Sequence, residues 1–305
     1  MVMRNPGRKD PKECEWPAAL REATGTPFAV TRLAGVGGPG SFRVEGPRAT
    51  VIYKRGVPPR ELAWYRRCAP HAAGLAAAGC RTAPLVASGH DPDPWLALGW
   101  AGPPLPRERW GTPLVLAALA SWHRAAALWE GPLGDAYPFA WDDGLTRDAL
   151  EVLAAPDRLA VRDGWGRAAE EAQRELFAPP GHAIHGDPNP TNWLLAADAE
   201  ESPLVLVDWA RSGRAHAAVD VAIALPGLPT HDRAAEAAQW YLHARPDLRE
   251  RDGRAWTRWI LLAKLWSVVE FLAMATRGAL SQEARSAVAF LREDLPGWSN
   301  QQAGR

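Results

Sequence analysis

The sequence predicts an α+β protein of two lobes, a small and mostly antiparallel β-sheet lobe with a helix, followed by a larger and mainly helical lobe. Short strand-like segments separated by Gly- and Pro-containing turns fill the first 100 residues, whereas long Ala- and Leu-rich segments dominate the rest. The length of 305 residues also agrees with about two domains.

The first predicted lobe spans residues 1–100 and begins with a polar tail over residues 1–15. Prolines at helix starts predict two helices, Pro17–Thr24 and about Pro59–Ala78. Segments rich in β-branched and aromatic residues predict five strands: Phe28–Ala34, Ser41–Glu45, Ala49–Lys54, Ala83–Ser88 and Trp95–Trp100.

The second predicted lobe covers residues 107–305 and follows a linker at residues 101–106, Ala-Gly-Pro-Pro-Leu-Pro. Three short strands are expected around a polar loop: Ala183–Ile184, Trp193–Ala196 and Leu204–Asp208. The expected helices are Pro113–Trp129, Thr146–Ala155, Gly166–Phe177, Ala217–Leu225, His231–Ala244, Arg254–Thr276 and Gln282–Glu293.

Composition argues against several classes of function. Lys plus Arg balances Asp plus Glu at 35 each, so the whole chain lacks the basic excess of a nucleic-acid-binding protein. The 16 tryptophans are spread without interleaved basic runs, which favours packing over base stacking. We therefore expect no nucleic-acid partner.

The sequence also predicts a cytoplasmic protein with no membrane segment. The three cysteines are scattered and form no CxxC pair, which fits reduced thiols. The N-terminus has no apolar run of the signal-peptide kind. The most hydrophobic stretch, Trp259–Ala275, is interrupted by Lys264 and Glu270, which favours a buried helix. Either a monomer or a homodimer fits this composition.

The strongest chemical signal is the segment His185-Gly186-Asp187-Pro188-Asn189-Pro190-Thr191-Asn192, followed by an apolar strand that ends at Asp208. A carboxylate at Asp187 can accept or orient the proton of an acceptor hydroxyl. The amide of Asn192 and the carboxylate of Asp208 are hard oxygen ligands suited to Mg²⁺. The set predicts phosphoryl transfer.

A second signal lies in the first lobe, where Gly35, Gly37 and Gly40 satisfy the pattern G-x-G-x-x-G. A strand follows this loop, so the context favours a phosphate-covering hairpin rather than a dinucleotide-binding turn. Fourteen residues after Gly40, a strand ends in Lys54, one of only four lysines in the chain. A lysine at this position can reach the α- and β-phosphates of a nucleotide.

Together these motifs resemble the aminoglycoside phosphotransferase and choline kinase superfamily, over about residues 28–275. The resemblance implies a protein-kinase-like fold and the cofactors ATP and Mg²⁺. It assigns the catalytic base to Asp187 and the metal ligands to Asn192 and Asp208. It gives His185 and Asp220 a structural role in bracing the loop.

The resemblance also implies residues on the nucleotide side. Lys54 and the glycines would hold the triphosphate, and Glu61 would pair with Lys54. The strand and hinge around Leu98 and Trp100 would receive the adenine through backbone groups.

The acceptor is left open by the sequence. Carboxylates at Asp142, Asp143 and Glu270 are candidates for binding an amine-bearing acceptor, and each can equally be a surface charge or a member of an ion pair. Antibiotics or other specialised metabolites are one acceptor class, and primary metabolites such as amino alcohols or sugars are the second. A catalytically silent nucleotide-binding module is the third reading, which the complete Lys-Asp-Asn-Asp set disfavours.

Overall fold

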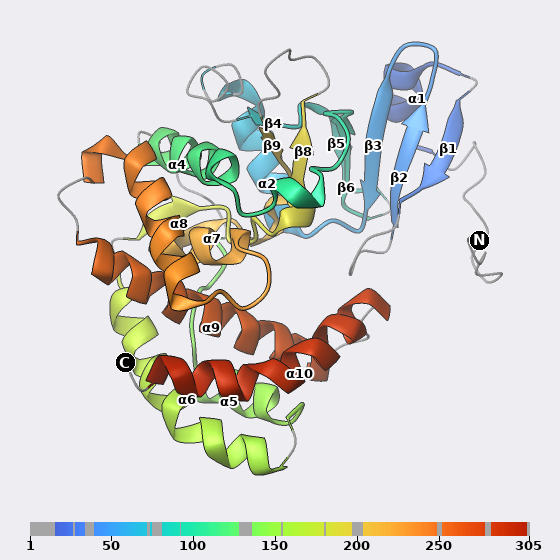
Figure 1. Cartoon of the computed structure of the whole chain (residues 1–305). Coiled ribbons are helices and arrows are strands. Elements are labelled where there is room, and N and C mark those ends of the chain that lie inside the picture. Colours follow the sequence, from blue (N-terminus) through green and yellow to red (C-terminus); the bar gives the residue numbers. More distant parts are fainter. Residues whose placement is uncertain are drawn as a thin grey trace. The chain divides into compact units, whose positions relative to one another are not determined.

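The structure is a computed structural model of the whole chain, and it describes residues 16–26, 28–33, 40–71, 74, 81–91, 93–127, 136–153, 155–179, 181–196, 204–248, 252–277 and 282–303 (Figure 1). The chain divides into two compact units. The first comprises Met1–Val57 and Pro84–Trp100, and the second comprises Pro58–Ala83 and Ala101–Arg305. A sheet dominates the first unit and helices dominate the second, which confirms the predicted α+β division.

The first unit is a five-stranded antiparallel sheet with one short helix, α1 (Ala18–Thr24). The strand order along the sheet is β1-β2-β3-β6-β5. In chain order the strands are β1 (Ala29–Arg32), β2 (Gly40–Glu45), β3 (Thr50–Arg55), β5 (Leu85–Gly89) and β6 (Trp95–Gly99).

Alternation along the central strands fixes which face of this sheet is buried. On β3, Val51 and Tyr53 are buried and join a cluster with Phe42 of β2, Leu20 of α1 and Trp16, which precedes α1. Lys54 follows Tyr53 and therefore lies on the opposite face. Its neighbours in register are Ser41 on β2 and Leu96 on β6.

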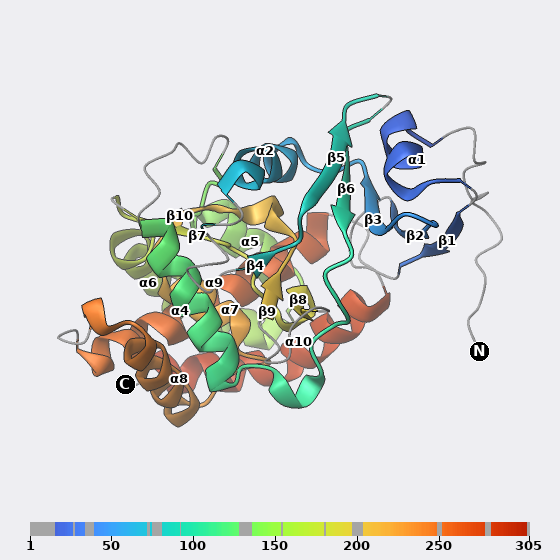
Figure 2. The same cartoon turned by 90° about the horizontal axis from the view of Figure 1, so that it is seen from above.

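The second unit is built around the long helix α9 (Gly253–Arg277), which contacts several shorter helices (Figures 1 and 2). These are α5 (Asp143–Leu150), α6 (Ala155–Glu175), α7 (Ala218–Ala224), α8 (His231–Ala244) and α10 (Gln282–Ala303). Helix α4 (Pro113–Ala127) packs against α7 and α8. Of the described helices, α9 is the one long and apolar enough to cross a membrane, but most of its apolar window is buried inside the unit, as in the core helix of a globular protein.

Two small sheets carry the polar loops of the second unit. One pairs β7 (His182–Ile184) with β10 (Gly213–Ala215), and the other has the order β4-β9-β8. Its strands are β4 (Arg81–Thr82), β8 (Trp193–Leu195) and β9 (Leu204–Leu206), with β8 antiparallel to β9 and β4 parallel to it. The loop after β7 and the loop after β9 are thereby brought together.

Helix α2 (Pro59–Cys68) belongs to the second unit, although the sequence placed it in the first lobe. The physical reason is aromatic packing. The indole of Trp64 on α2 stacks on that of Trp209, with ring centroids 3.7 Å apart and an interplanar angle of 6°. This stacking places α2 with the second unit, although α2 directly follows strand β3 of the sheet in the sequence.

The helix ends show where local pattern was insufficient. Helix α5 begins earlier than predicted because Asp142 caps it, accepting a hydrogen bond from the Leu145 amide at 2.7 Å. Helix α10 continues through Pro296, where the sequence predicted an end at Glu293. Buried packing of the helix beyond that point, including a 2.7 Å bond from Trp298 Nε1 to the carbonyl of Pro229, outweighs the proline.

A buried lysine in α9 makes the stability of the second unit depend on pH. Lys264 is 6% exposed, and its Nζ donates to the carbonyl of Leu225, at the end of α7, at 2.6 Å. Burial lowers the pKa of Lys264 from 10.5 to about 7. Between about pH 7 and pH 10 the unfolded chain therefore binds the extra proton, so this group contributes stability that increases as the pH rises.

We expect Lys264→Met to be more stable than the wild type at pH 6, by on the order of 3 kcal/mol, with the difference shrinking towards pH 10. Urea unfolding of both proteins at several pH values measures this difference in the free energy of unfolding. The contributions of the other titrating groups are the same in both proteins and cancel in the difference. A difference that stays constant with pH would contradict the prediction.

Candidate active site

The loop between β7 and β8 carries Asp187, and a glycine sets its shape. Gly186 has a φ of +82°, and a Cβ there would lie 2.2 Å from the carbonyl oxygen of Arg211. Both the backbone conformation and the close approach therefore require glycine at this position. The chain turns sharply there, so Asp187 lies at the tip of a fixed turn.

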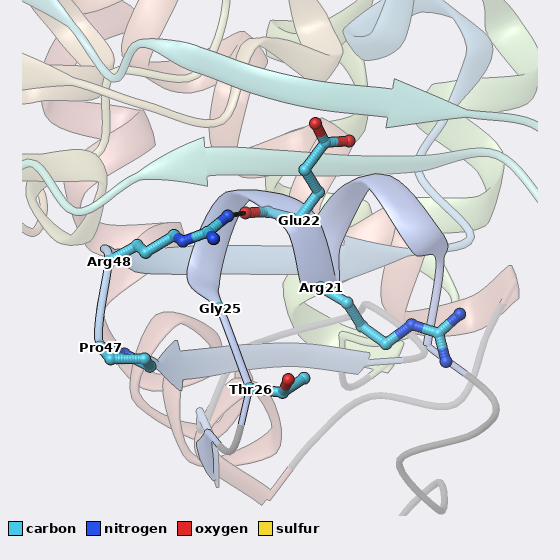
Figure 3. Close-up of a pocket in the computed structure, with 6 residues that line it drawn as sticks. All are labelled: Arg21, Glu22, Gly25, Thr26, Pro47 and Arg48. Carbon is cyan, nitrogen blue, oxygen red and sulfur yellow. Dashed lines mark hydrogen bonds between the residues drawn. The ribbon is translucent and has the colours of Figure 1, made fainter.

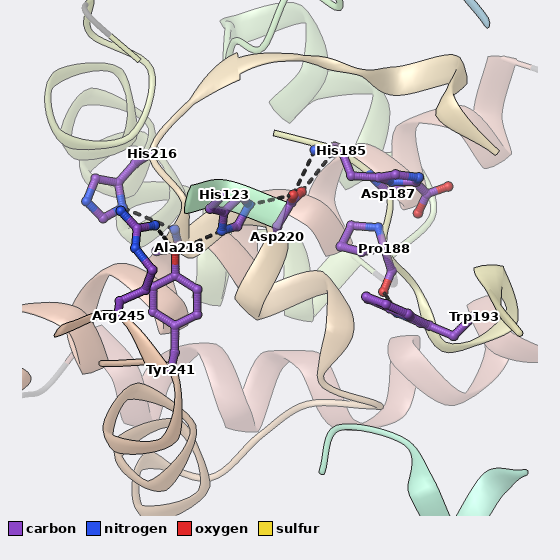
Figure 4. Close-up of polar contacts among 11 residues, drawn as sticks. His123, His185, Asp187, Pro188, Trp193, His216, Ala218, Asp220, Tyr241 and Arg245 are labelled. Atoms are coloured by element: carbon purple, nitrogen blue, oxygen red, sulfur yellow. Dashed lines mark hydrogen bonds and ion pairs between the residues drawn. The ribbon is translucent and has the colours of Figure 1, made fainter. Parts of the chain in front are cut away.

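The carboxylate of Asp220, in the first turn of α7, holds the same turn from below (Figure 4). Its Oδ2 accepts from the amide of His185 and its Oδ1 from the amide of Gly186, both at 2.8 Å. Asp220 is fully buried. A buried carboxylate that accepts two backbone N–H groups fixes the loop in one conformation.

His185 links this loop to the segment after β9. Its Nδ1 accepts from the Asp187 amide at 3.1 Å, so its Nε2 carries the proton and donates to the Val207 carbonyl at 3.0 Å. Burial lowers the pKa of His185 to about 4, which keeps the ring neutral. The ring also packs on Trp209, with centroids 4.3 Å apart. Through these contacts His185 connects the loop at Asp187 to the segment after β9.

Asp208 follows β9 in a left-handed conformation, with φ 69° and ψ 66°. Among the described residues other than glycine, it alone has a positive φ. Asp tolerates this region better than most residues, at a cost on the order of 1 kcal/mol. Such conformations concentrate at functional positions.

The pairing of β8 with β9 brings the two proposed metal ligands to one edge. Trp193 lies opposite Leu206, and the amide of Val207 donates to the carbonyl of Asn192 at 3.0 Å. Asn192 Nδ2 donates to the Asp187 carbonyl at 2.8 Å, which leaves Oδ1 as the ligating end of the amide. One amide and one carboxylate oxygen suit Mg²⁺, which takes its other ligands from phosphate and water.

The described residues contain no group of three or more His, Cys, Asp or Glu side chains placed to hold a metal ion. One amide oxygen and one carboxylate oxygen suit a hard cation that arrives with a phosphorylated ligand, for which two protein oxygens suffice. The donor chemistry at Asn192 and Asp208 therefore agrees with the magnesium ion that the sequence predicts.

The charge of Asp187 is set by burial and by one arginine. Burial raises the pKa of Asp187 to about 6, while Arg211 opposes that shift. Asn189 Nδ2 donates to Asp187 Oδ1 at 2.9 Å and favours the ionised form. In the sequence Asn189 stood out only as a member of the loop. This bond shows that it orients the carboxylate of Asp187.

Arg211 is held beside the loop by a buried polar cluster. Its Nη2 forms an ion pair with Glu270 Oε2, and its guanidinium lies over the ring of Tyr137, 4.7 Å from the centroid. Tyr137 donates its hydroxyl proton to Glu270 Oε1 at 2.6 Å. Burial raises the pKa of Tyr137 to about 12, so the phenol remains a donor.

This cluster bears on the acceptor-side candidates. Glu270 is 5% exposed and already accepts from Arg211 and Tyr137. Asp142 accepts the Leu145 amide as the N-cap of α5, and Asp143 stands exposed in the first turn of that helix. Of the three carboxylates, two therefore have internal partners, and recognition of an amine by them stays a prediction.

We expect Asp142→Ala to lower the free energy of unfolding by about 1 kcal/mol through loss of the helix cap. The Michaelis constant of the acceptor should change less than twofold if capping is the whole role of Asp142. Chemical denaturation and steady-state kinetics measure the two quantities. A large rise in that constant, with stability unchanged, would instead place Asp142 in the acceptor site.

The nucleotide-side residues lie in the first unit, apart from Glu61. Gly35 and Gly37 fall outside the described residues, and Gly40 begins β2. Leu98 is buried in β6, and the amide of Trp100 donates to the Thr50 carbonyl at 3.1 Å. Glu61, in α2, is 1% exposed and belongs to the second unit. Pairing of Lys54 with Glu61 stays a prediction.

An open hollow in the first unit is separate from all of these residues (Figure 3). It has a volume of about 690 Å³ and lies where the end of α1 meets the turn between β2 and β3. Arg48 Nη1 donates to the Glu22 carbonyl across it at 3.0 Å. Its lining residues are Arg21, Glu22, Gly25, Thr26, Pro47 and Arg48, and none of them is a predicted site residue.

Comparison with known proteins decides the family. The model of the phosphotransferase enzyme family matches residues 31–272. The chain belongs to this family. The match covers both lobes and every motif described above, and it confirms the resemblance and the predicted phosphotransferase class, a small-molecule kinase. No curated protein sequence matches the chain.

Solved structures confirm the fold of this family member. An amicoumacin kinase in complex with AMP-PNP, Ca²⁺ and Ami is 16% identical, with a TM-score of 0.58 and coverage of 88% of both chains. A microcompartment-associated aminopropanol kinase is 16% identical, with a TM-score of 0.63 and coverage of 94% of both chains. The GDP complex of aminoglycoside 2'-phosphotransferase-IIIa is 13% identical, with a TM-score of 0.64, over 92% of this chain and 96% of that one.

Sequence reasoning missed three residues of the site. Arg211 follows Asp208 by three positions, yet nothing local shows that it pairs with Glu270, 59 residues away. Tyr137 joins the same cluster from the segment before α5. His123, in the apolar helix α4, lies with its ring Nε2 3.0 Å from Asp220 Oδ2. A lone histidine within an apolar helix is the signal that could have pointed to it.

Proposed function

We propose that this phosphotransferase transfers the γ-phosphoryl group of ATP to a hydroxyl of a small molecule, most specifically an antibiotic or another specialised metabolite. The observation that carries the proposal is the fixed loop. Asp187 stands at its tip with Asn192 and Asp208 at the same strand edge, and Asp220 and His185 hold the backbone behind it. Catalysis of phosphoryl transfer rests mainly on positioning and charge stabilisation, which such a loop supplies.

The roles follow from the chemistry of each group. Asp187 accepts the proton of the acceptor hydroxyl and aims its oxygen at the γ-phosphorus. Asn192 and Asp208 would hold Mg²⁺, which neutralises phosphate charge when bound. Lys54 and the glycines at 35, 37 and 40 hold the triphosphate, Glu61 orients Lys54, and Leu98 and Trp100 border the adenine.

The titration of the loop is compatible with this role. With a pKa near 6, the Asp187 carboxyl is ionised at neutral pH and still basic enough to accept a proton. Arg211 lies close enough to offset part of the negative charge that builds up in the site. Both residues belong to the second unit, so this part of the proposal needs nothing from the first.

Two acceptor classes are supported by solved proteins of the same fold. The amicoumacin and aminoglycoside kinases support an antibiotic acceptor and a role in resistance or self-protection. The aminopropanol kinase supports the alternative, a primary metabolite such as an amino alcohol or a sugar. We further propose that the protein acts in the cytoplasm, as a monomer or homodimer, on a free small molecule.

The test is ADP release from Mg-ATP against a panel of hydroxylated antibiotics, amino alcohols and sugars. A parallel series with Mg-GTP asks which nucleotide is used, because solved relatives by fold include GDP complexes. Release that depends on one acceptor class supports the proposal and names the class. Nucleotide binding without release for any acceptor would favour the silent module, and absence of nucleotide binding would overturn the proposal.

A further inference from the structure

A line of hydrogen bonds continues from Asp220 away from the candidate catalytic loop (Figure 4). His123 Nε2, on α4, lies 3.0 Å from Asp220 Oδ2, and His123 Nδ1 lies 2.8 Å from the hydroxyl of Tyr241 on α8. Arg245 Nη1 donates to the same hydroxyl at 3.0 Å. Three helices of the second unit, α4, α7 and α8, are therefore joined through side chains.

The direction of the line follows from counting protons. Arginine can only donate, so the Tyr241 oxygen accepts from Arg245 and the Tyr241 proton is free to point to His123. Burial raises the pKa of Tyr241 and keeps that proton in place. Nδ1 of His123 then accepts, and Nε2 carries the ring proton and donates to Asp220. Tyr241 and His123 thus each donate one hydrogen bond and accept one.

Burial makes this line stiff. Asp220 and Tyr241 are fully buried, His123 is 1% exposed and Arg245 is 3% exposed. The line ends at the surface at Asp247, whose side chain is 49% exposed and which accepts three bonds from Arg245, at 2.6, 2.9 and 3.2 Å. A buried polar group that loses its partner has no water to replace it, so each member holds the next in place.

We propose that Tyr241 and Arg245 are positioning residues for the catalytic loop. Arg245 fixes the Tyr241 hydroxyl, Tyr241 fixes the ring of His123, and His123 fixes the Asp220 carboxylate, which holds the amides of His185 and Gly186. Asp187 follows these two residues directly, so its position depends on a cation at the end of α8. The link to catalysis rests on the proposed function. The link between Arg245 and the position of the loop does not, because it holds whatever the loop binds.

The test follows the two amides at the end of the line. Amide hydrogen exchange is measured by NMR in the wild type and in Tyr241→Phe. Exchange at His185 and Gly186 should become about tenfold faster in the variant, whereas exchange in β9 should change less than twofold. A merely destabilising substitution would instead accelerate exchange throughout the unit, β9 included.

Matched variants keep the test decisive. Tyr53→Phe removes a hydroxyl with no hydrogen-bond partner among the described residues, and it should leave both amides unchanged. Arg245→Met should reproduce the effect of Tyr241→Phe, and Arg245→Lys should restore much of the protection. If Tyr241→Phe does not fold, the comparison of Arg245→Met with Arg245→Lys tests the proposal by itself.

Two further readouts complete the experiment. Ring nitrogen shifts of His123 in the wild type should show a proton on Nε2, which faces Asp220, and none on Nδ1, which faces Tyr241. With any acceptor that supports turnover, Tyr241→Phe should lower kcat about tenfold and leave the KM for ATP within twofold. Unchanged exchange at His185 and Gly186 in Tyr241→Phe and Arg245→Met, or a ring protonated on Nδ1, would overturn the proposal, even if the protein proves to be a kinase.

Discussion

Replacing Asp187 by asparagine is expected to lower turnover by about 10²- to 10⁴-fold while Mg-ATP binding changes by no more than a few-fold. The amide has nearly the shape of the carboxylate, so the turn at Gly186 and the bonds to Asp220 remain. It cannot accept the hydroxyl proton, however, and it carries no charge to orient the acceptor. ADP release and equilibrium nucleotide binding, measured on the same preparations, separate the two effects.

A matched control is Asp232→Asn, which removes an exposed carboxylate in the first turn of α8, and its turnover should equal that of the wild type. Turnover of Asp187→Asn close to that of the wild type would remove Asp187 from the chemistry. Loss of Mg-ATP binding together with turnover would move Asp187 from the base to the metal site.

The order of the elements and the position of the loop could be predicted from the sequence. Short apolar segments such as Leu204–Leu206 stand next to polar residues, and that contrast indicates a buried strand followed by a functional turn. The length of α8 follows from periodicity and from Thr230, whose side chain caps the helix. Features that depend on neighbouring residues, such as periodicity and helix caps, can therefore be predicted from the sequence.

The rest depends on contacts between distant segments. Strand β10 is three residues long and exists because Gly213 lies opposite Ile184 of β7. The grouping of α2 with the second unit follows from the stack of Trp64 on Trp209, 145 positions further along. His123 gains its role from partners 97 and 118 positions away. No periodicity or spacing in one sequence selects such partners.

The same reasoning explains why the acceptor was harder to predict than the base. Asp187 and Asn192 lie in the loop that leads into β8, and Asp208 follows β9, so the pairing of these two neighbouring strands brings them to one edge. The acceptor side depends instead on how each carboxylate is partnered. Glu270 looks free in the sequence of an apolar helix, and only the fold shows Arg211 and Tyr137 against it.

The second large effect is expected for Asp220→Asn, in the buried carboxylate behind the loop. Asp220 accepts three donors, the amides of His185 and Gly186 and the ring N–H of His123. An asparagine offers one oxygen and turns an NH₂ group towards at least one of these donors. His123 can adapt by exchanging its tautomer, but a backbone amide cannot.

At least one buried N–H therefore loses its acceptor, and we expect the free energy of unfolding to fall by about 2–4 kcal/mol. That is a large part of the 5–15 kcal/mol typical of a folded protein. Urea unfolding measures the loss, and Asp232→Asn, an exposed carboxylate, should stay within about 0.5 kcal/mol of the wild type. Turnover should also fall at low temperature, where the variant is fully folded, because the loop at Asp187 is no longer fixed. A variant as stable as the wild type would show that the loop holds itself without Asp220.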